Sequence, residues 1–223
     1  MVSNVTYHPF GGVNGFTLGN GQVYSRPYDT DGRVSSYTLG TQTFAINYDL
    51  ASRITQISDT GNASNFNAYL YDTLDRLTTA NLPAGTSYGY AYDAVGNRTS
   101  KSISGSPETY TYDSNSNRIA TLTPTSGPTR TFSFDNNGST INDGLNGYIY
   151  DTRGRMVQAT SVVGTTTYQI NALGQRIRKT NSTDDRIFHY DTRGKLIGES
   201  DPGGTSWKRE YIFLGDIPVG VVQ

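Results

Sequence analysis

The feature that most constrains this sequence is a pair, made of an aromatic residue and an aspartate, that recurs about every twenty residues. The distances between successive Asp or Asn positions are 20, 23, 21, 20, 22, 16, 20 and 20 residues. The pairs, with one Ile-Asn variant, are Tyr28-Asp29, Tyr48-Asp49, Tyr71-Asp72, Tyr92-Asp93, Tyr112-Asp113, Phe134-Asp135, Tyr150-Asp151, Ile170-Asn171 and Tyr190-Asp191. A tenth, degenerate copy ends in Tyr211-Ile212-Phe213-Leu214-Gly215. A fixed period of this size is typical of repeat proteins, so the chain is predicted to consist of about nine to ten copies of one unit.

Each unit has the pattern of a β-hairpin. Aromatic residues often alternate before the Asp, as in Tyr69-x-Tyr71, and a period of two puts both rings on one face of a strand. The residues between the rings are expected on the more exposed face; they are Leu70, Ala91, Thr111, Ser133, Ile149 and His189. The Asp side chain can accept a hydrogen bond from the backbone N–H two residues on.

A glycine follows the Asp by three residues in six of the nine copies, at Gly32, Gly96, Gly138, Gly154, Gly174 and Gly194. Glycine suits the positive φ that closes a type I turn with a bulge. A basic and an apolar residue, such as Arg53-Ile54, then begin the return strand. In three copies the arginine comes one residue later, at Arg98, Arg118 and Arg176. Because a one-residue shift turns the following side chains to the other face, a longer turn or a bulge is expected there.

The repeat predicts an all-β fold of tandem antiparallel hairpins. Ten hairpins give about twenty strands and a ribbon roughly 95 Å wide, and open sheets of more than about ten strands curl. One long curled sheet, part of a spiral shell or barrel, is therefore expected, with residues 1–223 forming a single repeat region. Equivalent tyrosines are expected to stack in ladders between neighbouring hairpins. With 34% hydrophobic residues, 17 Tyr and 25 Gly, the structure should be thin and lack a deep core.

The units "YDTDGRV", "YDTLDRL", "YAYDAVGNR", "YIYDTRGRM" and "YDTRGKL" resemble the YD repeats of RHS proteins, bacterial toxin-complex shell subunits and teneurins. The opening "YHPFGGVNGFTLGNGQ" and the ending "REYIFLGDIPVGVV" are similar to segments of long RHS chains. The resemblance covers essentially the whole chain. It implies a fragment of a longer, secreted or cell-surface protein, in which the β-sheet encloses or displays a toxin or adhesion domain. The self-cleavage motif of RHS toxins is not matched, and Asp201-Pro202-Gly203-Gly204 is interpreted as a tight turn.

Other function classes find little support in the residues. The net charge of −1 gives no general attraction to nucleic acid, and the absence of Cys excludes thiolate catalysis and disulfides. The start of the chain lacks the features of a signal peptide, and no apolar run approaches the ~20 residues of a membrane span. His189 is interpreted as an ordinary strand residue, and Asp113–Asn117 as a repeat turn, since a calcium loop would need Gly at its sixth position.

These observations favour a structural module with no catalytic residues, cofactor or metal. Its expected partners are neighbouring repeats of the parent chain, other copies of itself and an enclosed toxin domain. The alternative is an extracellular adhesive or filament-forming module, in which exposed tyrosines and Trp207 stack on sugar rings. The sequence of the parent gene after Gln223 would separate these classes.

Overall fold

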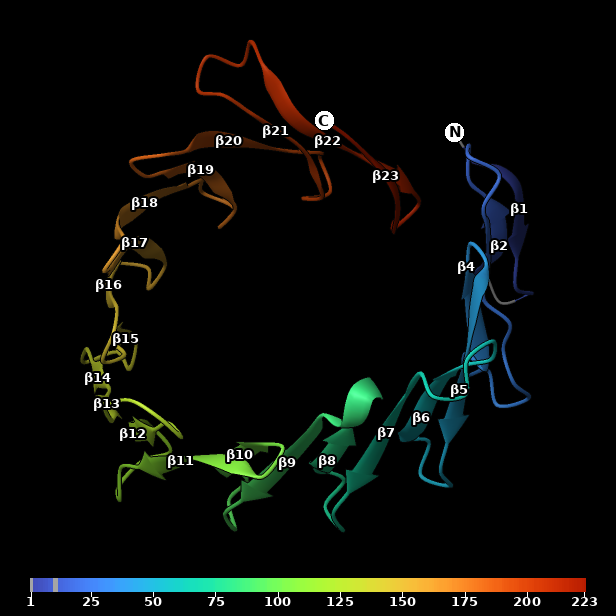
Figure 1. The fold of residues 1–223 in the computed structure, drawn as a ribbon. Coiled ribbons are helices and arrows are strands. Elements are labelled where there is room, and N and C mark those ends of the chain that lie inside the picture. The colour runs from blue at the N-terminus through green and yellow to red at the C-terminus, as the bar shows by residue number, and fades with distance from the viewer. Residues whose placement is uncertain (1, 10–11) are drawn as a thin grey trace. The chain divides into compact units, whose positions relative to one another are not determined.

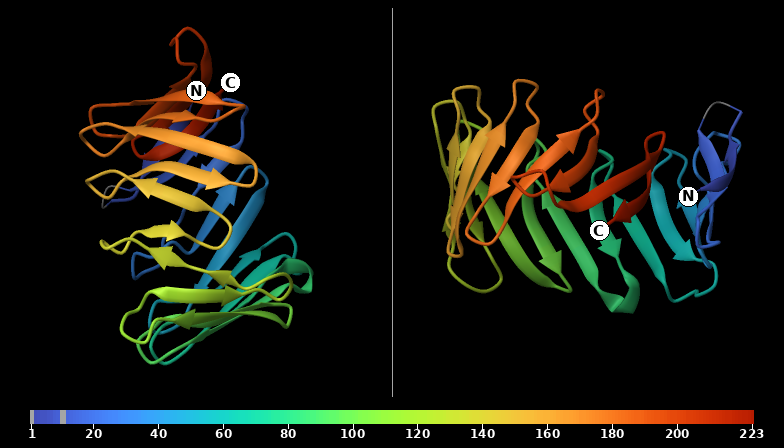
Figure 2. Two further views of the ribbon diagram at one scale, coloured as in Figure 1. Left: turned by 90° about the vertical axis from the view of Figure 1, so that its left-hand side faces the viewer. Right: turned by 90° about the horizontal axis from the view of Figure 1, so that it is seen from above.

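The computed structural model describes residues 2–9 and 12–223, so Phe10 and Gly11 of the opening segment lie outside the described residues. Their secondary structure is almost entirely β-strand, with one short 3-10 helix, η1 (Pro83–Gly85). The predicted all-β class of tandem antiparallel hairpins is therefore confirmed. Figures 1 and 2 show the hairpins following one another along the sheets, with turns at both rims.

Strands β1 to β13 form the first sheet, in which neighbours along the chain are also neighbours in the sheet. They are β1 (Ser3–Tyr7), β2 (Val13–Thr17), β3 (Val23–Ser25), β4 (Ser36–Leu39), β5 (Gln42–Tyr48), β6 (Ile54–Asp59), β7 (Phe66–Tyr71), β8 (Leu77–Asn81), β9 (Ser87–Tyr92), β10 (Arg98–Ile103), β11 (Ser106–Tyr112), β12 (Ile119–Thr123) and β13 (Arg130–Thr131).

Strands β14 to β23 form the second sheet in the same sequential order. They are β14 (Ser133–Phe134), β15 (Thr140–Asn142), β16 (Gly147–Tyr150), β17 (Met156–Ser161), β18 (Gly164–Ile170), β19 (Arg176–Thr180), β20 (Asp185–Tyr190), β21 (Leu196–Ser200), β22 (Trp207–Leu214) and β23 (Ile217–Val222). The degenerate tenth copy forms the hairpin of β22 and β23, in which Leu214 pairs with Ile217.

The chain divides into two compact units, residues 1–110 with 124–126, and residues 111–123 with 127–223. The prediction of one continuous sheet is wrong, because the ladder is interrupted at Phe132. Thr131 still pairs back to β12, whereas Ser133 already pairs forward with β15. The interruption lies just before the shortest interval, from Asp135 to Asp151, and the strands next to it have only two or three residues. Such short ladders leave few hydrogen bonds to hold one strand to both neighbours.

The two faces of the strands differ as the alternation predicted. Leu70, Ala91, Thr111, Ser133 and Ile149 are exposed, while the flanking aromatic residues are half-buried or buried. His189 is the exception and is half-buried, because the Trp207 ring lies 4.7 Å from its imidazole ring. Few side chains are fully covered, and the buried apolar ones are Phe16, Ala80, Tyr110 and Phe188. The described residues therefore form sheets without a deep core, and polar contacts along the turns carry much of the order.

Candidate functional site

The repeated aspartate turn is the principal polar site of each hairpin. In the turn between β5 and β6, Asp49 Oδ1 accepts hydrogen bonds from the backbone N–H groups of Ala51 (2.9 Å) and Arg53 (3.0 Å). Its Oδ2 accepts a third bond from Arg53 Nε at 2.7 Å. The backbone N–H of Arg53 in the first place, and then its side chain, hold the pKa of Asp49 below its usual value. The carboxylate therefore fixes both the turn and the first side chain of the return strand.

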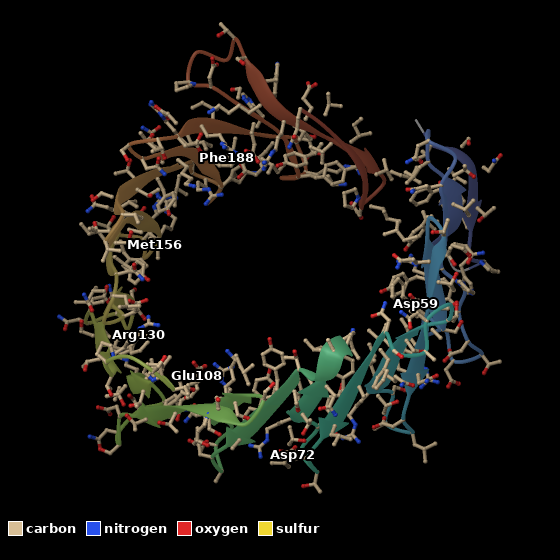
Figure 3. All side chains as sticks on the ribbon, viewed as in Figure 1. Asp59, Asp72, Glu108, Arg130, Met156 and Phe188 are labelled. Atoms are coloured by element: carbon tan, nitrogen blue, oxygen red, sulfur yellow. The ribbon has the colours of Figure 1, made fainter. Side chains whose placement is uncertain are left out.

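Seven further turns share this geometry, in which Oδ1 accepts from the N–H groups two and four residues on. They begin at Asp29, Asp72, Asp93, Asp135, Asp151, Asn171 and Asp191. Asp72, after β7, is labelled in Figure 3. The residue three positions on has a positive φ in every one, including the non-glycine residues Ser52 and Asp75. This is the predicted type I turn with a bulge.

The arginine of one turn also reaches the next hairpin. Arg53 Nη1 donates to the backbone oxygen of Asp72 (3.3 Å) and to Asp75 Oδ1 (2.6 Å). Arg76 Nη1 likewise donates to the backbone oxygen of Asp93 at 3.0 Å. In the second unit, Arg155 Nη1 donates to the backbone oxygen of Asn171 at 2.8 Å. One guanidinium thus joins two consecutive turns.

In five Tyr-Asp pairs the tyrosine is tied to the preceding hairpin by its hydroxyl group. Tyr71 OH donates to the backbone oxygen of Ile54 at 2.8 Å. The same bond recurs from Tyr48 to Val34 and from Tyr92 to Leu77, both at 2.8 Å, and from Tyr150 to Thr140 and Tyr190 to Arg176, both at 3.0 Å. The tyrosine is therefore a tether between repeats as well as an apolar ring. The sequence pattern did not reveal this role, because the acceptor is a backbone carbonyl.

The expected ladders of stacked tyrosines are not formed. The ring contacts of the described residues do not join Tyr48, Tyr71, Tyr92, Tyr150 or Tyr190 to the tyrosine of the next pair. Instead, the guanidinium carbon of Arg53 lies 5.0 Å from the centroid of the Tyr71 ring, and that of Arg76 lies 4.8 Å from that of Tyr92. Equivalent strands are two strand spacings apart, about 9.6 Å, which exceeds ring-contact distance. The arginine of the intervening strand fills that gap.

Of the three copies in which the arginine comes one residue later, two keep the usual turn length. Asn97 takes the place of the turn arginine, and its Nδ2 donates to Asp93 Oδ2 at 2.9 Å. Arg98 then lies opposite Tyr92 in the ladder, with its guanidinium carbon 4.7 Å from the centroid of the Tyr110 ring. Gln175 takes the place of the arginine beside Asn171, and its Oε1 accepts a hydrogen bond from Asn171 Nδ2 at 2.7 Å. Only the turn at Asp113 is longer, since Asp113 N bonds to the backbone oxygen of Arg118.

Two further clusters of polar side chains, one around Asp143 and one around Tyr110, were not identified from the sequence. Burial alone would raise the pKa of Asp143, but the backbone N–H groups of Leu145 and Asn146 lower it to about 2. Arg130 Nη2 lies 2.7 Å from the same carboxylate. On β11, burial and a hydrogen bond to Glu108 raise the pKa of Tyr110 to about 12. Neither cluster follows the repeat, which is why spacing gave no signal.

The most enclosed polar side chains lie near the end of the second sheet. Ser200 is fully buried, and its Oγ lies 2.9 Å from His189 Nε2 while it donates to the backbone oxygen of Asp201. A buried hydroxyl committed to a backbone carbonyl is not arranged as a nucleophile. The indole of Trp207 fits here because Gly198 has no side chain, and a Cβ would lie 2.5 Å from the ring. This pair therefore packs the sheet.

The remaining sequence interpretations concern turns. Asp201 begins a turn in which its own carbonyl accepts from Gly204 N at 3.0 Å, so the predicted tight turn is confirmed. Asp113 Oδ1 accepts from Asn115 N at 2.8 Å, as a repeat turn requires.

Among residues 2–9 and 12–223, no group of three or more acidic or His side chains is placed to hold a metal ion. Nor does any helix in this part of the chain have the length and apolarity of a membrane span.

Comparison with known proteins places this geometry among shell proteins. The family described as Teneurin YD-shell matches residues 85–213, more than half of the chain. The Tc holotoxin pore of Photorhabdus luminescens is similar at 16% identity with a TM-score of 0.50, over 93% of this chain and 14% of that one. A structure of TcdB2-TccC3 without the hypervariable C-terminal region is similar at 13% identity and a TM-score of 0.50, over 100% and 16%. The chain thus spans less than a fifth of these proteins, and the likeness shows the fold. No curated protein matched.

Proposed function

Because this chain belongs to the Teneurin YD-shell family, we propose that it forms part of a wall that encloses or displays a separate polypeptide domain. As an RHS/YD-repeat shell module, it is a structural element. The observation that carries the proposal is the double link between repeats. At several repeats the turn arginine binds the next turn and the tyrosine hydroxyl binds the hairpin before it, as Arg53 and Tyr71 illustrate. A sheet linked in these two ways at several of its repeats resists opening, which a container requires.

The similar structures suggest what such a wall encloses. Both contain TccC3, and one of them lacks a hypervariable C-terminal region. By analogy, we propose that the parent protein of this chain carries a toxin-like domain beside the wall and acts outside the cell or at its surface. We further propose that the wall contributes no catalysis. The buried Ser200 and its bond to a backbone carbonyl support this view.

Limited proteolysis of the full-length gene product tests the proposal. If the wall encloses a domain, that domain resists protease in the intact protein and is cleaved once the links between repeats are removed. Arg53→Ala combined with Arg76→Ala removes two of these links. Arg193→Ala is the matched control, because among the described residues its guanidinium donates no hydrogen bond. Equal cleavage of the domain in the native and the doubly substituted protein would contradict enclosure.

A further inference from the structure

We propose that a pocket in the first unit binds one pyranose ring of a neutral carbohydrate. The pocket has a volume of about 310 Å³ and lies between the loop from β6 to β7 and the loop from β8 to β9. Its lining includes Ser64, Phe66, Asn81, Leu82, Pro83 and Thr86. This binding site is independent of the proposed wall function, since neither loop contributes to the links between repeats.

The two loops depart from the repeat at the same rim of the sheet. The strand connections at this rim alternate with the aspartate turns and vary in length. Leu39 pairs with Gln42 and Ile103 pairs with Ser106, so only two residues connect those strands. The connections at 60–65 and 82–86 are longer, and they are consecutive. Because the two longer connections follow one another, they enclose the pocket between them.

Both loops are held in fixed conformations. In the first, the buried Asp59, labelled in Figure 3, accepts hydrogen bonds from Gly61 N (2.9 Å) and Asn65 Nδ2 (3.2 Å). In the second, Leu82 N donates to the backbone oxygen of Thr86 at 2.7 Å. Ala84 adopts the left-handed conformation with φ 62° and ψ 20°, which a residue with a side chain rarely does. Strained backbone of this kind clusters at ligand sites.

The lining determines the class of ligand. No charged side chain lines the pocket, so an ionic ligand would find no partner. Phe66, Leu82 and Pro83 supply an apolar surface for the C–H face of a sugar ring. Hydroxyl groups come from Ser64 and Thr86. The volume lies at the lower end of the usual range of about 300–1,000 Å³, which fits one ring.

Asn81 supplies a directed donor. Ser87 Oγ donates to Asn81 Oδ1 at 2.8 Å, and this bond fixes which end of the amide is the acceptor. Among the described residues, none accepts a hydrogen bond from Asn81 Nδ2, so this group can donate to a ligand hydroxyl. By contrast, the ring of Trp207, the site that the sequence suggested for sugars, already packs against His189. The pocket combines a directed donor, hydroxyl groups and an apolar surface in one cavity.

Saturation-transfer NMR and calorimetry of the whole chain test the proposal, with methyl glycosides of neutral hexoses and N-acetylhexosamines as probes. Saturable binding of at least one glycoside is expected, and Asn81→Ala should weaken it by about tenfold through loss of one directed hydrogen bond. Because Asn81→Ala also removes the bond to Ser87, Ser64→Arg serves as a second variant that fills the pocket from an exposed loop position. Trp207→Ala should leave binding unchanged.

Three results would overturn the proposal. They are the absence of saturable binding by every glycoside, binding that persists in Ser64→Arg, and binding that Trp207→Ala abolishes. The N-acetyl amides of leucine and phenylalanine are the comparison ligands, and preferential binding of either would assign the pocket to an apolar peptide side chain instead. Loss of sugar binding leaves protease protection of an enclosed domain unchanged, so this test and the test of the wall fail separately.

Discussion

Removing the hydroxyl of Tyr71 isolates the link between two repeats. In Tyr71→Phe, the ring stays beneath the Arg53 guanidinium, and only the hydrogen bond to the backbone oxygen of Ile54 is lost. A net intramolecular hydrogen bond stabilises a protein by about 0.5–1.5 kcal/mol. The Tyr71 ring is half-buried, so solvent replaces the lost bond at the carbonyl only in part. We expect a loss of about 1 kcal/mol in the free energy of unfolding.

The effect should accumulate along the repeat. Tyr48 and Tyr92 make the same 2.8 Å bond to Val34 and Leu77, and the three bonds share no partner. Because independent sites add, the triple tyrosine-to-phenylalanine variant should lose about 1.5–4.5 kcal/mol. Such a loss is a substantial part of the stability of a typical domain.

Urea unfolding monitored by circular dichroism measures the loss, and hydrogen exchange of the amides in β6 and β8 localises it, since a repeat protein can unfold in parts. Tyr37→Phe is the matched control, because Tyr37 stacks on Phe44 and its hydroxyl makes no hydrogen bond within the described chain. Equal stability of Tyr37→Phe and Tyr71→Phe would refute the reasoning. So would a triple variant no less stable than the single one.

Four further predictions follow from the turns and the sheet edges. Gly154→Val should lower stability by about 1 kcal/mol or more, because Gly154 has φ 72°, and thermal melting measures it. The pKa of Asp143 is depressed to about 2, so the ionised carboxylate stabilises the fold fully above about pH 5. This contribution is lost as the pH falls from about 4 to about 2. Melting temperatures should therefore decline across this range, and an unchanged melting temperature would contradict the prediction. The isolated chain should not cut itself at Asp201-Pro202, and a specific break seen by mass spectrometry and abolished by Asp201→Ala would contradict this. Since β1 and β23 are edge strands of their sheets, the purified chain should self-associate, and a stable monomer in light scattering at high concentration would exclude open edges.

The hairpins could be predicted from the amino-acid sequence alone, because their signals are local. Asp49 and Arg53 are only four residues apart, and the turn they form depends on short-range hydrogen bonds and on a positive φ at the fourth residue. The alternation of Tyr69 and Tyr71 fixes the face of a strand through the same local geometry. These interactions recur in copy after copy, so each turn could be predicted from its own few residues.

The contacts between repeats, by contrast, became visible only in the folded chain. Tyr71 bonds to a carbonyl 17 residues earlier, and its ring contacts the arginine that precedes that carbonyl, so both partners depend on strand register. The interruption at Phe132 depends on the lengths of several neighbouring strands together. The cover that Trp207 gives to His189 requires a glycine on the strand between them. Such contacts arise from the relative placement of distant segments, which a period in the sequence does not specify.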